Sequence, residues 1–148
     1  MPDTKLSVHL PSKPDEPEES TSDMSVRVEN RKWHIDLPNM AGGFSLDVMM
    51  VAPGLTLRRD QEDVFYRYPR HALERQAKAR FVAERAATFG VFKATELEYA
   101  LPTGEPVVVR YGFVHSGGRQ MFVVAVAGGK AVAPADRAAF LDSIRAAK

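Results

Sequence analysis

Cysteine is absent from this chain of 148 residues. Disulfide bridges, thiolate metal sites and cysteine nucleophiles are therefore excluded, and cysteine usage gives no indication of the redox compartment. The fold must be stabilised by packing instead. Because 45% of the residues are hydrophobic, we expect one domain with a substantial core, and the chain is too short for two domains of ordinary size.

Long apolar runs are also missing. The longest, such as residues 121–127, are far shorter than the roughly 20 apolar residues that span a bilayer. The chain does not open with a basic segment followed by an apolar one, as a secretory leader does. We therefore expect a soluble, cytoplasmic protein without a transmembrane segment.

Catalytic and metal-binding motifs are lacking as well. The four histidines fall at no metal-ligand spacing, and no serine stands in a G-x-S-x-G elbow. The acids Glu96 and Glu98 are close enough in sequence for acid–base work, but solvated charge on a strand is their expected role. The sequence therefore predicts no metal, no cofactor and no enzymatic activity.

The charged residues are unevenly distributed. Residues 1–25 contain six acids and two lysines, so they carry about −4 and the remainder about +5. The stretch "PSKPDEPEESTSD" at 11–23 has no large apolar side chain, and it cannot bury enough surface to offset the entropy lost on ordering. We predict that residues 1–24 form a disordered acidic tail and that residues 25–148 form a single domain.

Alternating apolar and polar residues indicate strands after this tail. "SVRVENRKWHIDLP" at 25–38 predicts one strand, and "GGFSLDVMMVAPG" at 42–54 predicts a second that ends at a Pro-Gly turn. We interpret "LTLRRDQEDVFYRYP" at 55–69 as two short strands joined at a charged tip. Residues 91–106 are typical of another strand that leads into a Pro-Thr-Gly turn.

Two segments have the composition of helices. "RHALERQAKARFVAERAATFG" at 70–90 is rich in good helix formers, contains no internal Gly or Pro, and ends at Gly90. It predicts a long helix at about 70–89. "PADRAAFLDSIRAAK" predicts a second helix at about 135–147, which buries Phe140, Leu141 and Ile144.

The most strongly patterned stretch is "VVVRYGFVHSGGRQMFVVAVAGG" at 107–129. Gly117 and Gly118 predict a two-residue hairpin turn, because both can adopt the positive φ of a type I′ turn. This turn pairs Phe113 with Phe122, and both faces of the hairpin are apolar. We expect a central position in a mainly antiparallel sheet covered on both sides, and hence an α+β fold.

The hairpin tip raises the question of a ligand site. Glycine amides, a serine hydroxyl, an imidazole and a guanidinium could bind an anion there. The simpler interpretation is a turn that leaves Arg119 in solvent. The alternative is a small-molecule or anion-binding protein, or an enzyme, with a pocket between the sheet and the long helix and with Tyr111, His115 and Arg119 at its mouth.

A second candidate site is the basic side of the predicted long helix. If the protein binds a partner there, Arg70, Arg75, Lys78 and Arg85 would provide contacts that weaken as salt rises. Few aromatic residues interleave these cations, which argues against nucleic acid and in favour of a protein partner. The acidic tail could also cover this surface. The sequence identifies neither the partner nor the oligomeric state.

The second half of the chain resembles the PsbP-like superfamily. The resemblance covers roughly residues 42–147 and is carried by the turn "LPTGEP" at 101–106, the hairpin with its hydroxyl-glycine tip, and "FLDSIR" at 140–145. The superfamily includes a photosystem II extrinsic protein, a Ran-binding nuclear import factor and bacterial chaperones of secretion effectors. The resemblance implies an α-β-α sandwich and a non-enzymatic accessory or adaptor role in binding another protein. It transfers no functional residue.

Overall fold

A computed structural model describes residues 6–8, 17–36, 43–76, 78–116, 118–129 and 132–146. These residues form a seven-stranded sheet in which all neighbouring strands are antiparallel. The fold therefore belongs to the α+β class with a mainly antiparallel sheet, as the sequence predicts. The strands follow the order β2 (Glu18–Asp23), β3 (Arg27–Asp36), β4 (Gly43–Val51), β8 (Arg119–Gly128), β7 (Pro106–Ser116), β6 (Phe92–Ala100) and β5 (Arg80–Phe89).

The central hairpin is confirmed. Strands β7 and β8 pair with Phe113 opposite Phe122 and with Gly112 opposite Val123, which is the expected register. Gly118 has a φ of 75°, a backbone conformation that glycine adopts without strain. Gly117 lies outside the described residues. Strands β4 and β6 pair with the two outer edges of the hairpin. The hairpin therefore lies in the middle of the sheet, with both of its faces available for packing.

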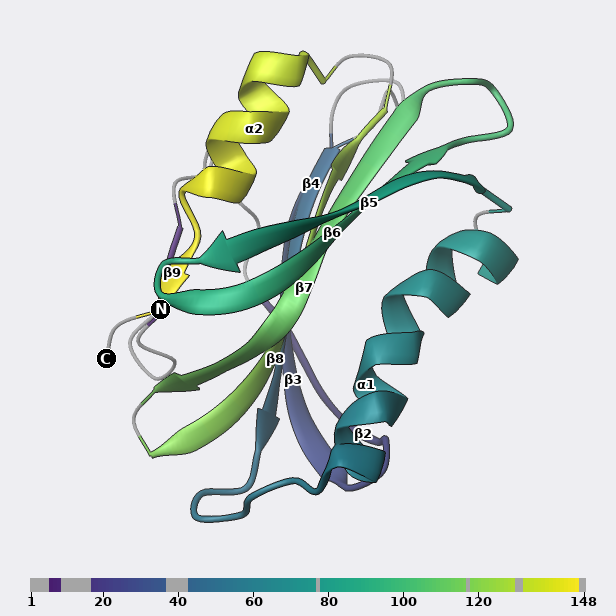
Figure 1. The fold of residues 1–148 in the computed structure, drawn as a ribbon. Coiled ribbons are helices and arrows are strands. Elements are labelled where there is room, and N and C mark those ends of the chain that lie inside the picture. The colour runs from purple at the N-terminus through teal and green to yellow at the C-terminus, as the bar shows by residue number, and fades with distance from the viewer. Residues whose placement is uncertain are drawn as a thin grey trace.

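One helix lies on each face of the sheet (Figure 1), α1 (Arg59–His71) on one side and α2 (Pro134–Asp142) on the other. Residues on alternate positions of β7 divide between two apolar clusters, as the period of a strand requires. Val109 and Phe113 face α1, and its Phe65 is fully buried against them. Val108 and Val114 face α2, where Phe140 and Leu141 complete the other cluster.

The prediction of a long helix at 70–89 is wrong. The longer helix is α1, which occupies the stretch interpreted as two short strands, and residues 80–89 form the edge strand β5. The charged tip "RRDQED" starts the helix rather than a turn: Asp60 and Glu62 lie in the first turn, where acids favour the helix dipole, and Gln61 Oε1 accepts the Arg58 N–H at 2.9 Å.

A short π-helical turn, η2 (Ala72–Gln76), follows α1, and the chain then turns away from helix at Lys78, whose φ is 53°. The alanine-rich segment beyond this point pairs with β6 along almost its whole length. The helix propensity of its residues is a weak local preference, and the ladder with β6 together with burial of Phe89 outweighs it.

The predicted C-terminal helix is present but shorter than expected. Helix α2 ends at Asp142, and the buried positions Phe140, Leu141 and Ile144 are confirmed. Arg145–Ala146 forms a short strand, β9, which pairs with β1 (Leu6–Ser7) near the start of the chain.

The sheet begins inside the segment predicted to be a disordered tail. Residues 18–23 form the edge strand β2 and pair with β3, and residues 6–7 form β1, so at these eight positions the prediction is wrong. The reason is that cross-strand partners hold a segment that buries little surface of its own. Residues 1–5 and 9–16 of the predicted tail lie outside the described residues. No helix in the described ranges is long and apolar enough to cross a membrane.

Candidate functional site

Two adjoining pockets open on the α1 face of the sheet. The larger has a volume of about 480 Å³ and the smaller, under the C-terminal end of α1, about 170 Å³. Lys32, Ser45 and Val126 line both of them, so the two pockets adjoin. We call the two together the α1 pocket. Its further lining residues are Glu18, His34, Gly43, Phe44, Leu101, Val107, Gly128 and Gly129 in the larger part, and Asp47, Tyr68, Pro69, Ala72, Leu73, Val109 and Val124 in the smaller.

The antiparallel register brings the polar residues of the α1 pocket together. Lys32 lies directly opposite Asp47 across the β3–β4 pair, and His34 lies opposite Ser45. Directly opposite residues point to the same face of a sheet, so these four side chains converge on the side of α1. Their sequence spacing of two within each strand is what places them on one face.

The floor and the roof of the smaller part are apolar. Val124 and Val126 of β8 lie opposite Asp47 and Ser45 across the β4–β8 pair. Residues at the end of α1 and in η2 cover this floor, among them Tyr68, which is exposed, and Leu73, which is buried. An apolar cavity of this kind with a few polar groups is the usual form of a small-molecule site.

Asp47 is the unusual residue of the α1 pocket. Burial raises the pKa of its carboxyl group, and the positive charge of Lys32 offsets only part of this shift. Its Oδ1 atom is buried and has no hydrogen-bond partner in the described part of the chain. A buried carboxyl oxygen without a donor costs free energy, so Asp47 is a candidate functional group rather than a packing residue.

Tyr68 is affected by the same surroundings. Burial raises the pKa of its phenol, and the nearby carboxylate of Asp47 raises it further. Tyr68 therefore keeps its proton at neutral pH and can donate a hydrogen bond into the pocket. His34 and Ser45 add an imidazole and a hydroxyl. Among the described residues there is no group of three or more His, Asp or Glu side chains that could hold a metal ion.

The residues predicted at the mouth of a pocket do not meet at one site. Tyr111 is buried under α1, with its ring centroid 5.9 Å from that of Phe122. His115 is exposed on β7, and Arg119 donates from Nε to the carbonyl oxygen of Val51 at 2.9 Å. Arg119 is thus held by the backbone, and the prediction that it lies in solvent is wrong. None of the three predicted residues lines the α1 pocket.

The predicted basic helix face does not form either, because its residues belong to different elements. Arg70 lies on α1, Arg75 in η2, Lys78 in the following loop and Arg85 on β5. Arg70 pairs with Glu84, and Arg85 pairs with Glu96 and, at 3.3 Å, with Glu98. Acids of the same chain therefore compensate two of the four cations.

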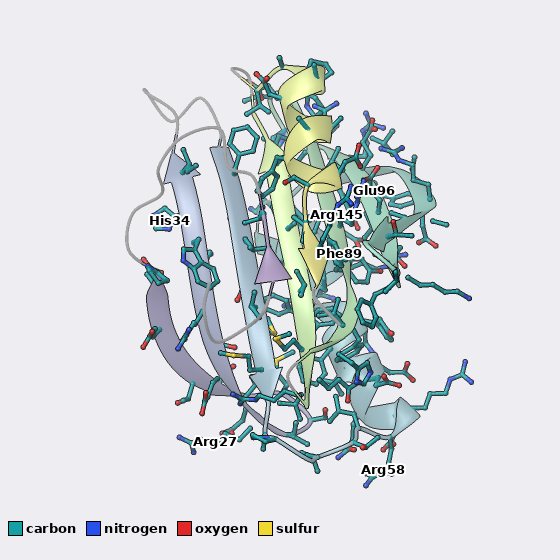
Figure 2. All side chains as sticks on the ribbon, turned by 90° about the vertical axis from the view of Figure 1, so that its left-hand side faces the viewer. Arg27, His34, Arg58, Phe89, Glu96 and Arg145 are labelled. Atoms are coloured by element: carbon teal, nitrogen blue, oxygen red, sulfur yellow. The ribbon has the colours of Figure 1, made fainter. Side chains whose placement is uncertain are left out.

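A buried ionic cluster lies on the opposite face of the sheet. Arg110 Nη2 donates to Glu96 Oε1 at 2.8 Å and to Asp142 Oδ1 at 2.9 Å, and its Nη1 donates to the carbonyl oxygen of Leu141 at 3.1 Å. Glu96 is only 8% exposed, so the expectation that it is solvated is wrong. Figure 2 shows Glu96 well away from His34, which confirms that this cluster and the α1 pocket are separate. The cluster joins α2 to the sheet.

The sequence patterns do not identify Lys32, Asp47 or Tyr68, and they indicate neither metal binding by His34 nor serine catalysis by Ser45. One signal was present in the sequence. Asp47 is the only charged residue in the apolar strand "GFSLDVMMV", at a position that alternation places on the same face as buried Met49. A charged residue on a buried face indicates a functional group or an ion pair.

Comparisons of the chain with protein-family models, with curated proteins and with solved structures find no match. The PsbP-like resemblance therefore remains a prediction from the sequence.

Proposed function

We propose that this protein binds a small, partly apolar molecule in the α1 pocket. The observation that carries the proposal is the position of Asp47, a charged residue that lines the smaller part of the pocket beside Val124 and Val126, where burial raises the pKa of its carboxyl group. Ionisable groups whose pKa is shifted by burial are common at binding sites. A bound ligand would contact this part of the pocket.

The size and lining of the pocket agree with this proposal. Its larger part, about 480 Å³, lies within the range of roughly 300–1,000 Å³ that is typical of small-molecule sites, whereas the smaller part, which Asp47 lines, is about 170 Å³. Valines of β8 offer apolar contact, while Ser45 and Lys32 stand at the junction of the two parts and can orient a polar group. The proposed role is binding without chemical turnover.

A thermal-shift screen of small molecules tests the proposal. A ligand that binds only the native state raises its stability by about 2.7 kcal/mol at one hundred times its Kd, which is readily detected as a higher Tm. The screen is run on the full chain and on two variants. Val126→Phe fills the pocket, and Val91→Phe makes the same change at a position that is 64% exposed and remote from it.

We expect ligands that stabilise the full chain and Val91→Phe but not Val126→Phe. Stabilisation of all three proteins to the same extent would place binding elsewhere. A broad screen without any stabilising compound would contradict the proposal, provided that all three proteins are folded.

Protein binding through the edge strand β5 is a second candidate function. In the described part of the chain this ten-residue strand has a neighbour on one side only, and two apolar residues near its start, Phe81 and Val82, are each 45% exposed. An extended segment of another protein could pair with its free edge and cover both side chains. The accessory or adaptor role therefore remains a proposal. Its binding surface would be the free edge of β5 and not the predicted basic helix.

Val82→Lys tests the second candidate. A positive charge there should abolish capture of a partner in a pull-down, because it opposes strand addition at the edge. Leu55→Lys is the matched control, since Leu55 is similarly exposed, at 42%, and lies outside β5. Equal capture by both variants would exclude β5 as the binding surface.

A further inference from the structure

The two edges of the seven-stranded sheet differ in how they are protected against pairing with another strand. Strand β2 at one edge contains no large apolar residue and carries three acids, Glu18, Glu19 and Asp23. Charged side chains on an edge strand oppose the addition of a further strand. Strand β5 at the other edge (Figure 1) has only small, uncharged residues at 86–88. Pairing is therefore expected at β5 and not at β2.

The charged residues within β5 are compensated by the same chain. Glu84 pairs with Arg70 of α1. Arg85 pairs with Glu96 and, at 3.3 Å, with Glu98, both on β6. These two are the only charged residues of the strand after its first position. Charge therefore does not protect this edge as it protects β2.

Apolar side chains are exposed at both ends of β5. Phe81 and Val82 near its start are each 45% exposed, and Val91, which follows the end of the strand, is 64% exposed. Midway between Phe81 and Val91 lies Ala86, which is itself exposed. Two antiparallel copies of β5 related by a two-fold axis at Ala86 would bring the apolar start of each strand next to Val91 of the other copy.

The charges of β5 exclude other registers of such a pair. A two-fold axis between two antiparallel strands is perpendicular to the sheet, so residues directly opposite each other lie on the same face. An axis at Glu84 or at Arg85 would place that charge opposite the same charge of the other copy, which destabilises the pair. An axis nearer the start would lead through the bulge between Phe81 and Ala83, where the ladder is irregular. The axis therefore lies beyond Arg85.

An axis at Ala86 gives the longest ladder of the remaining registers. It places Glu84 opposite Thr88 on one face and a small alanine opposite Arg85 on the other, so no like charges face each other directly. Residues 83–89 of each copy then take part in the ladder, whereas a later axis would shorten it. The main-chain hydrogen bonds of such a ladder provide affinity, and the exposed apolar side chains at its two ends become covered.

This inference rests on the second candidate function, strand pairing at β5, and names its partner. We propose that two copies of this chain pair through β5, antiparallel and with Ala86 at the two-fold axis, to form one continuous sheet. The interface uses none of the residues that line the α1 pocket, so it is independent of ligand binding there.

Sedimentation of the full chain over a range of concentrations tests for the dimer. We expect a reversible dimer in the unmodified chain. Ala86→Lys places two like charges at the axis, so the Kd of the dimer should rise about tenfold. Leu55→Lys is the control, because Leu55 is 42% exposed and lies outside β5, and its Kd should stay within about twofold. Circular dichroism checks that both variants are folded.

The absence of native cysteine allows the register to be tested directly. Ala86→Cys places two thiols opposite each other with Cα atoms about 4.5–5.5 Å apart, a separation that a disulfide spans. Thr88→Cys is the matched control, because Thr88 is exposed on the same face of β5 but its two copies would lie about 14 Å apart. Under mild oxidation we expect a covalent dimer from Ala86→Cys and none from Thr88→Cys.

Failure of this inference is distinguishable from failure of the second candidate function. A full chain that stays monomeric at every concentration, a dimer that Ala86→Lys leaves unchanged, or equal crosslinking of the two cysteine variants would overturn self-pairing. If Val82→Lys nevertheless abolishes capture of a different protein, strand pairing at β5 stands without self-pairing. If the chain does not dimerise and Val82→Lys captures as much as Leu55→Lys, both are overturned.

Discussion

Lys32 and Asp47 face one another across the β3–β4 pair, and both line the α1 pocket without forming an ion pair with each other. Burial raises the pKa of Asp47 because the charged form loses hydration, and the positive charge of Lys32 acts in the opposite direction but does not prevail. Asp47 thus destabilises the fold when it is ionised. Groups of this kind are common at binding sites, where function rather than stability accounts for them.

The pH dependence of stability should reveal the cost of Asp47. Its pKa is higher in the folded chain than in the unfolded chain, so the native state loses stability as pH rises from about 3.9 through the raised pKa. Asp47→Asn removes this loss. The free energy of unfolding of the variant, relative to that of the unmodified chain, should therefore increase between about pH 3.9 and neutrality and be constant below. Chemical denaturation over this pH range measures the difference, and a pH-independent difference would contradict the account.

Tyr99 makes an analogous contribution at alkaline pH. Burial raises the pKa of its phenol to about 12, and its hydrogen bond of 2.8 Å to Oε2 of Glu74 adds to the shift. Because the folded state holds this proton more tightly than the unfolded state, stability should fall as pH rises from about 10 to 12. The stability of Tyr99→Phe should fall less steeply over the same pH range. Parallel stability curves for the two proteins would exclude Tyr99 as the group responsible.

The ionic cluster under α2 should matter for stability through Arg110. Its guanidinium group is buried and donates to Glu96, to Asp142 and to backbone carbonyls. Arg110→Met removes the buried partner of Glu96 and leaves it only the more exposed Arg85, so it should lower the free energy of unfolding by about 2 kcal/mol. Asp142→Asn is the control, with an expected loss below about 1 kcal/mol, because the Asp142 side chain is 68% exposed. Similar losses in the two variants would show that burial does not distinguish these contacts.

Gly112 is required where β6 and β7 approach each other. A Cβ atom at this position would lie 2.8 Å from the carbonyl oxygen of Lys93 and 3.1 Å from the Cα of Ala94, both backbone atoms of β6. Gly112→Ala must therefore push the two strands apart, at a cost of about 1–3 kcal/mol. Equilibrium denaturation measures this loss. A variant as stable as the unmodified chain would mean that the strands are farther apart than described.

The central hairpin could be predicted from sequence because its information is local. Gly117 and Gly118 specify the turn, and the alternation on either side then fixes the register. The position of the longer helix could not be predicted in this way. Residues 80–89 have the composition of a helix, and their strand conformation depends on β6, which lies later in the chain.

The α1 pocket cannot be predicted from the sequence for a similar reason. Lys32, Asp47 and Tyr68 come from β3, β4 and α1, and only the β3–β4 register together with the position of α1 brings them to one cavity. No short motif joins them. The isolated charge at Asp47 was the one local indication that this face of β4 is more than a packing surface.

The most direct test of the account is the location of a ligand. The backbone amide spectrum of the full chain is recorded with and without a compound that raises its Tm. The account predicts that the largest shifts occur at Ser45, Asp47, Ala72 and Val126, which line the α1 pocket. Shifts confined to the edge strand β5, or to the buried ionic cluster around Arg110, would contradict it.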